Sequence, residues 1–359
     1  MMANNKIALI LPANTWVSPY LSIYMRELSA QSIAYDIISW NRDGTDGDVG
    51  IQYNVQCGDC HRIKKFMAYM GFVRFVKHVL DKNKYDKLVI FTAQLSILLY
   101  PFIRIKYNKK YIVDYRDFSI EQHPFFRLLF RNVVRRSYAN VVSSVGYIPY
   151  LPNCTSYILC HNMNIEDVDK ALANNTPSIH SHSLIRVLTI GGIRNAQANI
   201  EIINSFANDK SFHMDFVGKG PALPRLKEYA MVEHVDNISF VGFYKKEMEA
   251  SFVRDCSIMN IYFPNTPSHT AIMSNRFYNA LIYRKPMIVL ADSIQGKYVE
   301  DNDLGVAVRD CTHLSDKVKM WLAQVDSKDF DQKCNQLLMQ FRQDHDIFVN
   351  VLMQFCHNN

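Results

Sequence analysis

The chain has 359 residues, which is long for one domain and suits two. Hydrophobic residues make up 48% of it and charged residues 21%, as in an ordinary globular protein. No apolar run approaches the ~20 residues of a membrane-spanning helix, and residues 1–6 lack the apolar region of a signal peptide. These features argue against an integral membrane protein or a secreted one and predict a cytoplasmic protein.

The net charge of +6 is unevenly distributed along the chain. Residues 1–165 hold half of the 40 basic residues but only 11 of the 34 acidic ones, a net charge of +9, whereas residues 166–359 carry −3. A basic first half indicates that this half meets an anionic surface or an anionic acceptor.

The eight cysteines are scattered, and Cys57 and Cys60 form the only CxxC pair. A zinc site needs a second pair or nearby histidines, and no second cluster follows at the spacing of a zinc ribbon. The sequence therefore favours free thiols in a reducing compartment, and no metal ligands are predicted.

The first half alternates short apolar runs with amphipathic stretches, a pattern typical of α/β proteins. Strands are predicted at residues 6–11, 35–39, 87–92, 111–114, 140–143 and 157–160, and helices at residues 21–30, 62–84, 94–106 and 125–138. Asn14, Thr15 and Trp16 follow the first strand at its carboxyl end, where α/β sheets place their ligands. They are candidate contacts for an acceptor, with a plain strand-to-helix turn as the alternative.

Two of these helices, 62–84 and 125–138, combine apolar side chains with many basic ones. The apolar positions of the first are Ile63, Phe66, Met67, Met70, Val73 and Val76, and the second carries Arg127, Arg131, Arg135 and Arg136. A basic amphipathic helix lies on an anionic membrane or packs on a core with its basic face in solvent, and both alternatives stay open. No nucleic-acid-binding motif is present, so lipid or phosphate is preferred over nucleic acid.

The strand at 111–114 ends in the segment Asp114-Tyr-Arg-Asp117, and His123 follows in the next loop. Two carboxylates around one guanidinium often form a structural ion network. At the carboxyl end of a strand they are also candidates for a general base or for binding sugar hydroxyls. Asp114, Asp117 and His123 are therefore candidate catalytic residues, and Arg116 is a candidate acceptor contact.

A polar stretch at residues 166–183 is predicted to link two domains. Its His180 and His182 are interpreted as loop residues because no acidic partner for a metal site is nearby. The second half again alternates, with strands at 184–190, 212–217, 237–241 and 256–262, a loop at 263–270, and closing helices at 313–323 and 329–356. Glycine turns follow two of the strands, at Gly191-Gly192 and at Gly218, and they let a phosphate approach the backbone.

The stretch from Ser274 to Leu290 predicts a short helix that runs into a buried strand. Ser274 is a suitable N-cap, Phe277, Ala280 and Leu281 form an apolar helical face, and Pro286 ends the helix. Asn275 and Arg276 lie in the first turn, where unpaired N–H groups, the helix dipole and a cation favour a phosphate. An ordinary surface helix is the alternative.

The order Asn275-Arg-Phe-Tyr-Asn-Ala-Leu281, followed by Lys-Pro and an apolar strand, resembles the nucleotide-sugar segment of GT-B glycosyltransferases, particularly retaining family 4. The turn Gly218-Lys-Gly-Pro221 and the strand end Asp114-Tyr-Arg-Asp117 are similar to segments of the same group. This chain departs where the family's ribose-binding glutamate falls on Asn279, its glycine on Arg284 and its upstream acidic residue on Ala271. A glutamate reintroduced at position 279 is expected to preserve or tighten donor binding.

The resemblance implies an α/β GT-B fold, with two doubly wound Rossmann-like parallel-sheet domains that face a cleft. The expected domains are an acceptor-binding domain at 1–165, a nucleotide-sugar-binding domain at 183–344, and a last helix at 345–359 that crosses back to the first domain. The residues implied at the donor site are Gly191, Gly192, Arg194, Gly218, Lys219, Phe243, Tyr244, His269, Thr270, Ser274, Asn275, Arg276 and Asn279.

The implied function is hexosyl transfer from a nucleotide-sugar to a lipid-linked or polysaccharide acceptor of a bacterial envelope, capsule or exopolysaccharide. The implied enzyme is retaining, needs no metal or other cofactor, and works in the cytoplasm, peripherally on the inner face of the membrane. A non-hydrolysing nucleotide-sugar epimerase and a catalytically weak nucleotide-sugar binding protein remain alternatives. The absence of a GxGxxG fingerprint argues against a dehydrogenase.

Overall fold

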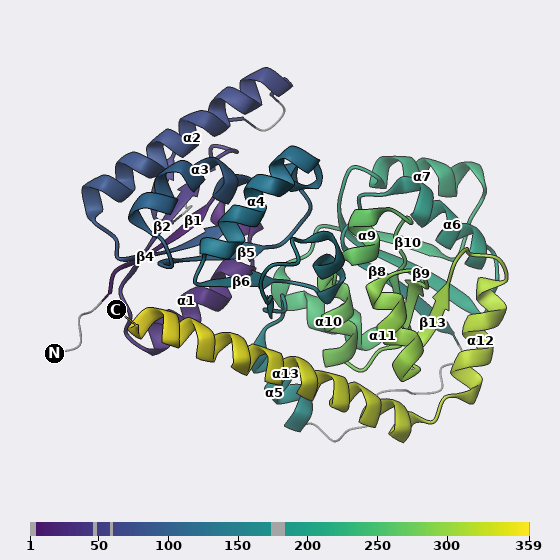
Figure 1. Ribbon diagram of the computed structural model, residues 1–359. Helices are drawn as coiled ribbons and strands as arrows, with labels where there is room; N and C mark the ends of the chain where they lie inside the picture. The colour runs from purple at the N-terminus through teal and green to yellow at the C-terminus, as the bar shows by residue number, and fades with distance from the viewer. Residues whose placement is uncertain (1–4, 46–48, 58–59, 174–183, 359) are drawn as a thin grey trace. The chain divides into compact units, whose positions relative to one another are not determined.

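The computed structural model describes residues 5–45, 49–57, 60–173 and 184–358 (Figure 1). The chain folds into two compact units, one made of residues 1–162 and 343–359 and the other of residues 163–342. Each unit contains a parallel β-sheet with helices packed on it. No helix in the described ranges combines the length and apolar character that crossing a bilayer requires.

The sheet of the first unit has the strand order β3-β2-β1-β4-β5-β6-β7, and each neighbouring pair is parallel. Its described strands are β1 (Ile7–Leu11), β2 (Tyr35–Trp40), β3 (Ile51–Tyr53), β4 (Lys87–Phe91), β5 (Tyr111–Tyr115), β6 (Ala139–Val142) and β7 (Ile158–Leu159). The central strands β1, β4 and β5 are buried along their whole length, which explains their nearly continuous apolar sequences.

Helices connect these strands and fix where the basic residues lie. They are α1 (Tyr20–Ala30), α2 (Arg62–Asn83), α3 (Ala93–Lys106) and α4 (Pro124–Arg136), with the 3-10 turns η1 (Thr15–Val17), η2 (Ile120–Gln122) and η3 (Val145–Tyr150). Helix α4 buries Phe130, Val133 and Val134, so its arginines lie on the exposed side. Helix α2 buries one face from Ala68 onward, whereas Ile63, Phe66 and Met67 near its start are 70%, 59% and 59% exposed. The core-packing alternative therefore fits the helix from Ala68 onward and does not fit these first apolar residues.

The sheet of the second unit has the order β10-β9-β8-β11-β12-β13 and is also parallel throughout. Its described strands are β8 (Ile185–Gly192), β9 (Phe212–Lys219), β10 (Ile238–Gly242), β11 (Ile258–Ile261), β12 (Met287–Leu290) and β13 (Gly305–Val308). Its helices are α5 (Ile165–Ala173), α6 (Ala196–Phe206), α7 (Leu223–Val232), α8 (Glu249–Asp255), α9 (Pro267–Ala271), α10 (Asn275–Ile282), α11 (Ile294–Asn302) and α12 (Leu314–Gln324), with the 3-10 turn η4 (Lys246–Met248). The two sheets confirm the predicted doubly wound α/β architecture.

The first part of the stretch predicted as a linker is a helix in the structure. Residues 165–173 form helix α5, because Ile165, Val168 and Ala171 repeat at helical spacing and are buried in the core of the second unit. Glu166 and Asp167 lie in its first turn, where carboxylates favour the helix dipole. The rest of the predicted linker, with His180 and His182, lies outside the described residues.

The last helix, α13 (Ser327–His357), contributes to both units (Figure 1). Its first part buries Phe330 and Phe341 in the core of the second unit. Its last part buries Phe348, Leu352 and Phe355 in the core of the first unit, among residues of β1, β4 and α1. The helix end is held by the buried Lys87 ammonium, which donates to the carbonyls of Phe355 and Cys356 in the last turn and of Asn358 just after it.

Candidate functional site

The predicted donor residues gather at the carboxyl edge of the second sheet. In this sheet the chain goes from β8 to its neighbour β9 and then to β10, and it later returns to place β11 on the opposite side of β8. The direction of the strand order therefore reverses between β8 and β11. Parallel sheets bind ligands in the crevice at such a switch point. The turn Gly191-Gly192 ends β8, Lys219 ends β9, and Asn260 lies near the end of β11.

Two glycines at this edge have different roles. Gly218 pairs in register with Gly191 at a φ of +140°, and a Cβ added to it would lie 2.0 Å from the Gly191 carbonyl oxygen. Gly218 is therefore required for the close packing of β8 on β9. Among the described residues, nothing lies within 4 Å of such a Cβ at Gly191, whose φ is +94°, and at Gly192 the Arg194 Nε lies 3.5 Å away. The backbone of the Gly191-Gly192 turn is thus open to a ligand.

We expect Gly218→Ala to lower the free energy of unfolding by about 1–3 kcal/mol, since its methyl group meets backbone that cannot move aside. Gly192→Ala should fold normally, because the flexible Arg194 side chain is its sole close neighbour among the described residues, yet it should weaken donor binding. Urea denaturation and calorimetric titration with UDP measure the two effects. Normal donor binding by a folded Gly192→Ala would show that no ligand approaches this turn.

The Arg276 guanidinium bonds main-chain carbonyls of both β8 and β11 at the switch point. Its Nε donates to the carbonyl of Ile190 (2.6 Å), and its two terminal nitrogens donate to the carbonyls of Gly192 (3.0 Å) and Asn260 (3.4 Å). The guanidinium also lies 5.5 Å from the centroid of the Phe263 ring. Its hydrogen bonds therefore go to neutral carbonyls, and it forms no ion pair with a carboxylate in the described ranges. Burial lowers the pKa of Arg276 to about 10.

Two further cations lie near the glycine turns. Arg194 is exposed beside Gly192. Lys219 is exposed at the end of β9, and its ammonium lies 4.5 Å from the centroid of the Phe243 ring, which is itself 68% exposed. Neither cation forms an ion pair with any described carboxylate. With Arg276, they make a cluster of positive charge that forms no ion pair with a carboxylate in the described part of the chain, and such a cluster favours an anion.

In the predicted loop at 263–270 and at the start of α10, several of the predicted donor side chains bond other protein groups. The ring of His269 stacks on Phe263 at 5.4 Å, and its Nδ1 is 2.7 Å from the Thr266 hydroxyl. The Thr270 hydroxyl donates to the carbonyl of Pro267 (3.1 Å). Ser274 caps α10 as predicted and donates to the Gln295 side-chain oxygen (2.7 Å), so its hydroxyl is committed to the protein. Asn275, the first residue of α10, is exposed.

Asn279 is paired with a carboxylate that the sequence did not indicate. Its amide nitrogen donates to one oxygen of Glu249 (2.8 Å), and the Tyr244 hydroxyl donates to the other (2.7 Å). Lys246 forms an ion pair with the same carboxylate. Burial and the bond to Glu249 raise the pKa of Tyr244. The bond to Glu249 orients Asn279 so that its side-chain oxygen, which accepts no bond from a described residue, is available to a ligand hydroxyl.

This contact changes the expectation for a glutamate at position 279. Asn279→Glu would place a second carboxylate beside Glu249 and replace a hydrogen bond by repulsion, so we expect donor binding about 10- to 100-fold weaker. The double variant Asn279→Glu with Glu249→Gln restores one carboxylate and one amide and should recover most of the affinity. Calorimetry with UDP on both variants measures this. Tight binding by the single variant would contradict a direct contact between the two side chains.

In the first unit, Asp114 and Arg116 form a buried ion pair. The Arg116 Nε is 2.5 Å from one Asp114 oxygen, its Nη2 is 2.6 Å from the other, and the Tyr24 hydroxyl also donates to the carboxylate (2.7 Å). Arg116 further donates to the Cys160 carbonyl (2.9 Å). Burial alone would lower the pKa of Arg116, but the charge of Asp114 raises this pKa well above its usual value. Asp114 is fully buried, so this arrangement favours the structural ion network over a base that reaches substrate.

The other predicted residues of the first unit divide between structural and exposed positions. His123 caps α4 by accepting from the Phe125 N–H (3.3 Å), and Asp117 is exposed and accepts from the Phe118 N–H (2.8 Å). Asn14 is buried and bonds Asn41 (2.8 Å).

Next to Asn14, Thr15 and Trp16 lie in η1 at the carboxyl end of β1, and Trp16 is 64% exposed. Trp16, Asp117 and His123 are therefore the predicted residues of this unit that are exposed to solvent. In the described part of the chain, no group of three or more histidines, cysteines or carboxylates could hold a metal ion.

No protein-family model and no curated protein sequence matches the chain. Solved structures do match along nearly its whole length. Sucrose-phosphate synthase from Thermosynechococcus elongatus is 16% identical, with a TM-score of 0.71 over 98% of each chain. Anabaena HepE in complex with UDP and glucose is 11% identical, with a TM-score of 0.64 over 98% of this chain and 100% of that one. UDP-N-acetylglucosamine 2-epimerase from Rickettsia bellii is 13% identical, with a TM-score of 0.57 over 96% and 98%. At these identities the likeness establishes the fold: the chain has the GT-B fold of two Rossmann-like domains.

Proposed function

We propose that the second unit binds a nucleotide-sugar at the carboxyl edge of its sheet and that the protein transfers the sugar to an acceptor. The observation that carries this proposal is the cluster of Arg194, Lys219 and Arg276 around the open turn Gly191-Gly192, none of which forms an ion pair with a described carboxylate. A nucleoside diphosphate has the charge and shape that such a turn accepts. HepE, which shares the fold, was solved with UDP bound.

The proposed chemistry is electrostatic. As the bond between the sugar and the diphosphate breaks, negative charge grows on the leaving oxygen, and the three cations stabilise that charge. Charge neutralisation by these side chains would make the transfer metal-independent. The exposed ring of Phe243, beside Lys219, would stack on the nucleotide base, and Asn279, held by Glu249, would accept a bond from a ribose hydroxyl.

The acceptor belongs to the first unit in this proposal. Trp16 is exposed at the carboxyl end of β1 and offers a flat apolar face to a sugar ring, and Asp117 is an accessible carboxylate for its hydroxyls. The excess positive charge and the exposed apolar side chains at the start of α2 support a lipid-linked acceptor at an anionic membrane. We therefore propose a peripheral, cytoplasmic, retaining enzyme of bacterial envelope polysaccharide synthesis.

Two measurements on the wild-type protein test this function. Titration with UDP should show binding, and UDP at about 100 times its dissociation constant should stabilise the protein by about 2.7 kcal/mol in thermal denaturation. Turnover of UDP-sugars should then depend on an added acceptor. Conversion to an epimer without acceptor would instead favour the epimerase alternative, which shares this fold. Absence of nucleotide binding would contradict both.

A further inference from the structure

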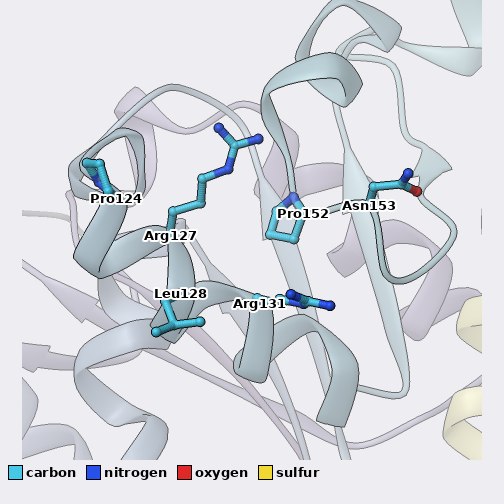
Figure 2. A pocket seen from close by; sticks show the side chains of 6 residues that line it. All are labelled: Pro124, Arg127, Leu128, Arg131, Pro152 and Asn153. Carbon is cyan, nitrogen blue, oxygen red and sulfur yellow. The ribbon is translucent and has the colours of Figure 1, made fainter.

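Helix α4 forms one wall of a surface pocket in the first unit. The pocket has a volume of about 400 Å³, within the range of small-molecule sites, and is lined by Pro124, Arg127, Leu128, Arg131, Pro152 and Asn153. Figure 2 shows that the Arg127 and Arg131 side chains extend from the helix toward the segment that carries Pro152 and Asn153. The pocket therefore combines two guanidinium groups with the apolar side chains of Pro124, Leu128 and Pro152.

The wall opposite the helix is fixed in place. Pro152 is buried, its carbonyl accepts bonds from the Tyr157 hydroxyl (2.8 Å) and the Cys154 N–H (2.9 Å), and the Cys154 thiol contacts the Arg131 carbonyl (3.9 Å). The main chain of α4 is thus tied to the segment that faces it. A pocket held in this way is preformed and needs little ordering when a ligand binds.

The charge of the pocket is unbalanced. None of its six lining residues is acidic, and the whole of α4 contains four arginines and no carboxylate. Neither Arg127 nor Arg131 forms an ion pair within the described ranges. Two guanidinium groups that line one pocket, without a carboxylate partner among the described residues, are suited to the oxygens of a phosphate group.

Two apolar side chains on the same helix face indicate how that phosphate is presented. Phe125 and Leu128 are each 60% exposed, and Leu128 forms part of the pocket. Inorganic phosphate would gain nothing from exposed apolar side chains beside its site, whereas a lipid places apolar chains next to its phosphate. We propose that this pocket binds the head-group phosphate of an anionic membrane lipid, with Phe125 and Leu128 entering the interface.

This inference specifies the membrane contact of the proposed function, but it concerns a separate site in the other unit. Arg127 and Arg131 have matched controls on the same helix. Arg135 and Arg136 are also exposed, but they lie outside the pocket. General attraction to an anionic surface would depend equally on both pairs. A phosphate pocket depends on Arg127 and Arg131.

The experiment compares Arg127→Ala with Arg131→Ala, as a double variant, against the double variant Arg135→Ala with Arg136→Ala. Binding is measured by sedimentation with phosphatidylcholine vesicles that contain phosphatidic acid as the minor component. We expect the pocket variant to bind at least about 150-fold more weakly than the wild type, and the control variant no more than about 30-fold more weakly. Circular dichroism checks that both are folded, and Arg127→Lys with Arg131→Lys should bind at an intermediate level.

Equal losses in the two double variants would overturn the pocket in favour of general electrostatic attraction. Wild-type protein that ignores these vesicles but binds inorganic phosphate in a calorimetric titration, with the pocket variant not binding it, would overturn the lipid and assign a soluble phosphate. UDP titration of the wild type is independent of both results. If UDP does not bind while the vesicle results hold, the proposed function fails and the lipid site stands.

Discussion

Arg116→Ala should lower the free energy of unfolding by about 3–5 kcal/mol, the usual cost of leaving a buried charge without its partner. The variant would leave the fully buried Asp114 carboxylate without the two bonds that it receives from Arg116. It would also remove the Arg116 donor from the Cys160 carbonyl. The Tyr24 hydroxyl alone cannot compensate for a full charge. Denaturation in urea, with the same slope expected for both proteins, measures the loss.

A neutral double variant provides the control. Asp114→Asn with Arg116→Gln removes both charges and keeps hydrogen-bonding groups of similar size, so it should be clearly more stable than Arg116→Ala. Recovery in the double variant would assign the pair to the architecture of β5. If Arg116→Ala unfolds at the same urea concentration as the wild type, the pair does not hold the fold, and a role in acceptor binding regains support.

Arg276→Ala should weaken UDP binding by about 1.5–3 kcal/mol, roughly 10- to 150-fold, which is the range for a charged hydrogen bond. Two effects act in the same direction. The variant removes a cation that pairs with no carboxylate in the described ranges, and it releases the carbonyls of Ile190 and Gly192, which loosens the turn that the phosphates would approach. Arg276→Lys keeps the charge but not the forked geometry, so we expect an intermediate affinity by calorimetry.

Arg186→Ala is a matched control for this experiment. Arg186 lies near the amino end of the same strand, β8, and its guanidinium is already paired with Asp215 at 3.0 Å. Its removal takes the same charge from the same unit, away from the carboxyl edge of the sheet. We expect UDP affinity to stay within about twofold, since distant surface charges are screened by salt. A folded Arg276→Ala with the affinity of the wild type would exclude Arg276 as a diphosphate ligand.

The sequence was sufficient for features that depend on neighbours along the chain. Continuous apolar runs such as Ile7–Leu11 predicted buried parallel strands, and the Ser274 N-cap predicted the start of α10, because periodicity and capping act over a few residues. Helix α5 was missed because its polar residues dominate the composition of the stretch. Its apolar face, Ile165, Val168 and Ala171, was the signal that could have identified it.

The candidate site was harder to predict because its contacts join distant segments. Glu249 precedes Asn279 by 30 residues, and the sequence gave no sign that these two side chains meet. In the same way, Tyr24 and Asp114 are 90 residues apart, so their contact and the burial of Asp114 could not be read from the Asp114-Tyr-Arg-Asp117 pattern. A pattern identifies which residues carry charge, and the packing decides which of those charges a ligand can reach.

The end of α13 has a consequence for how the protein is made. Phe348, Leu352 and Phe355 complete the apolar core of the first unit, yet they leave the ribosome after all of the second unit has been synthesised. At about 5–20 residues per second, the nearly complete first unit would wait about 10–40 s for its last helix. During this time the apolar surface that α13 later covers is exposed, and a chaperone is the expected occupant. Residues 1–162 expressed alone should keep that surface exposed and aggregate.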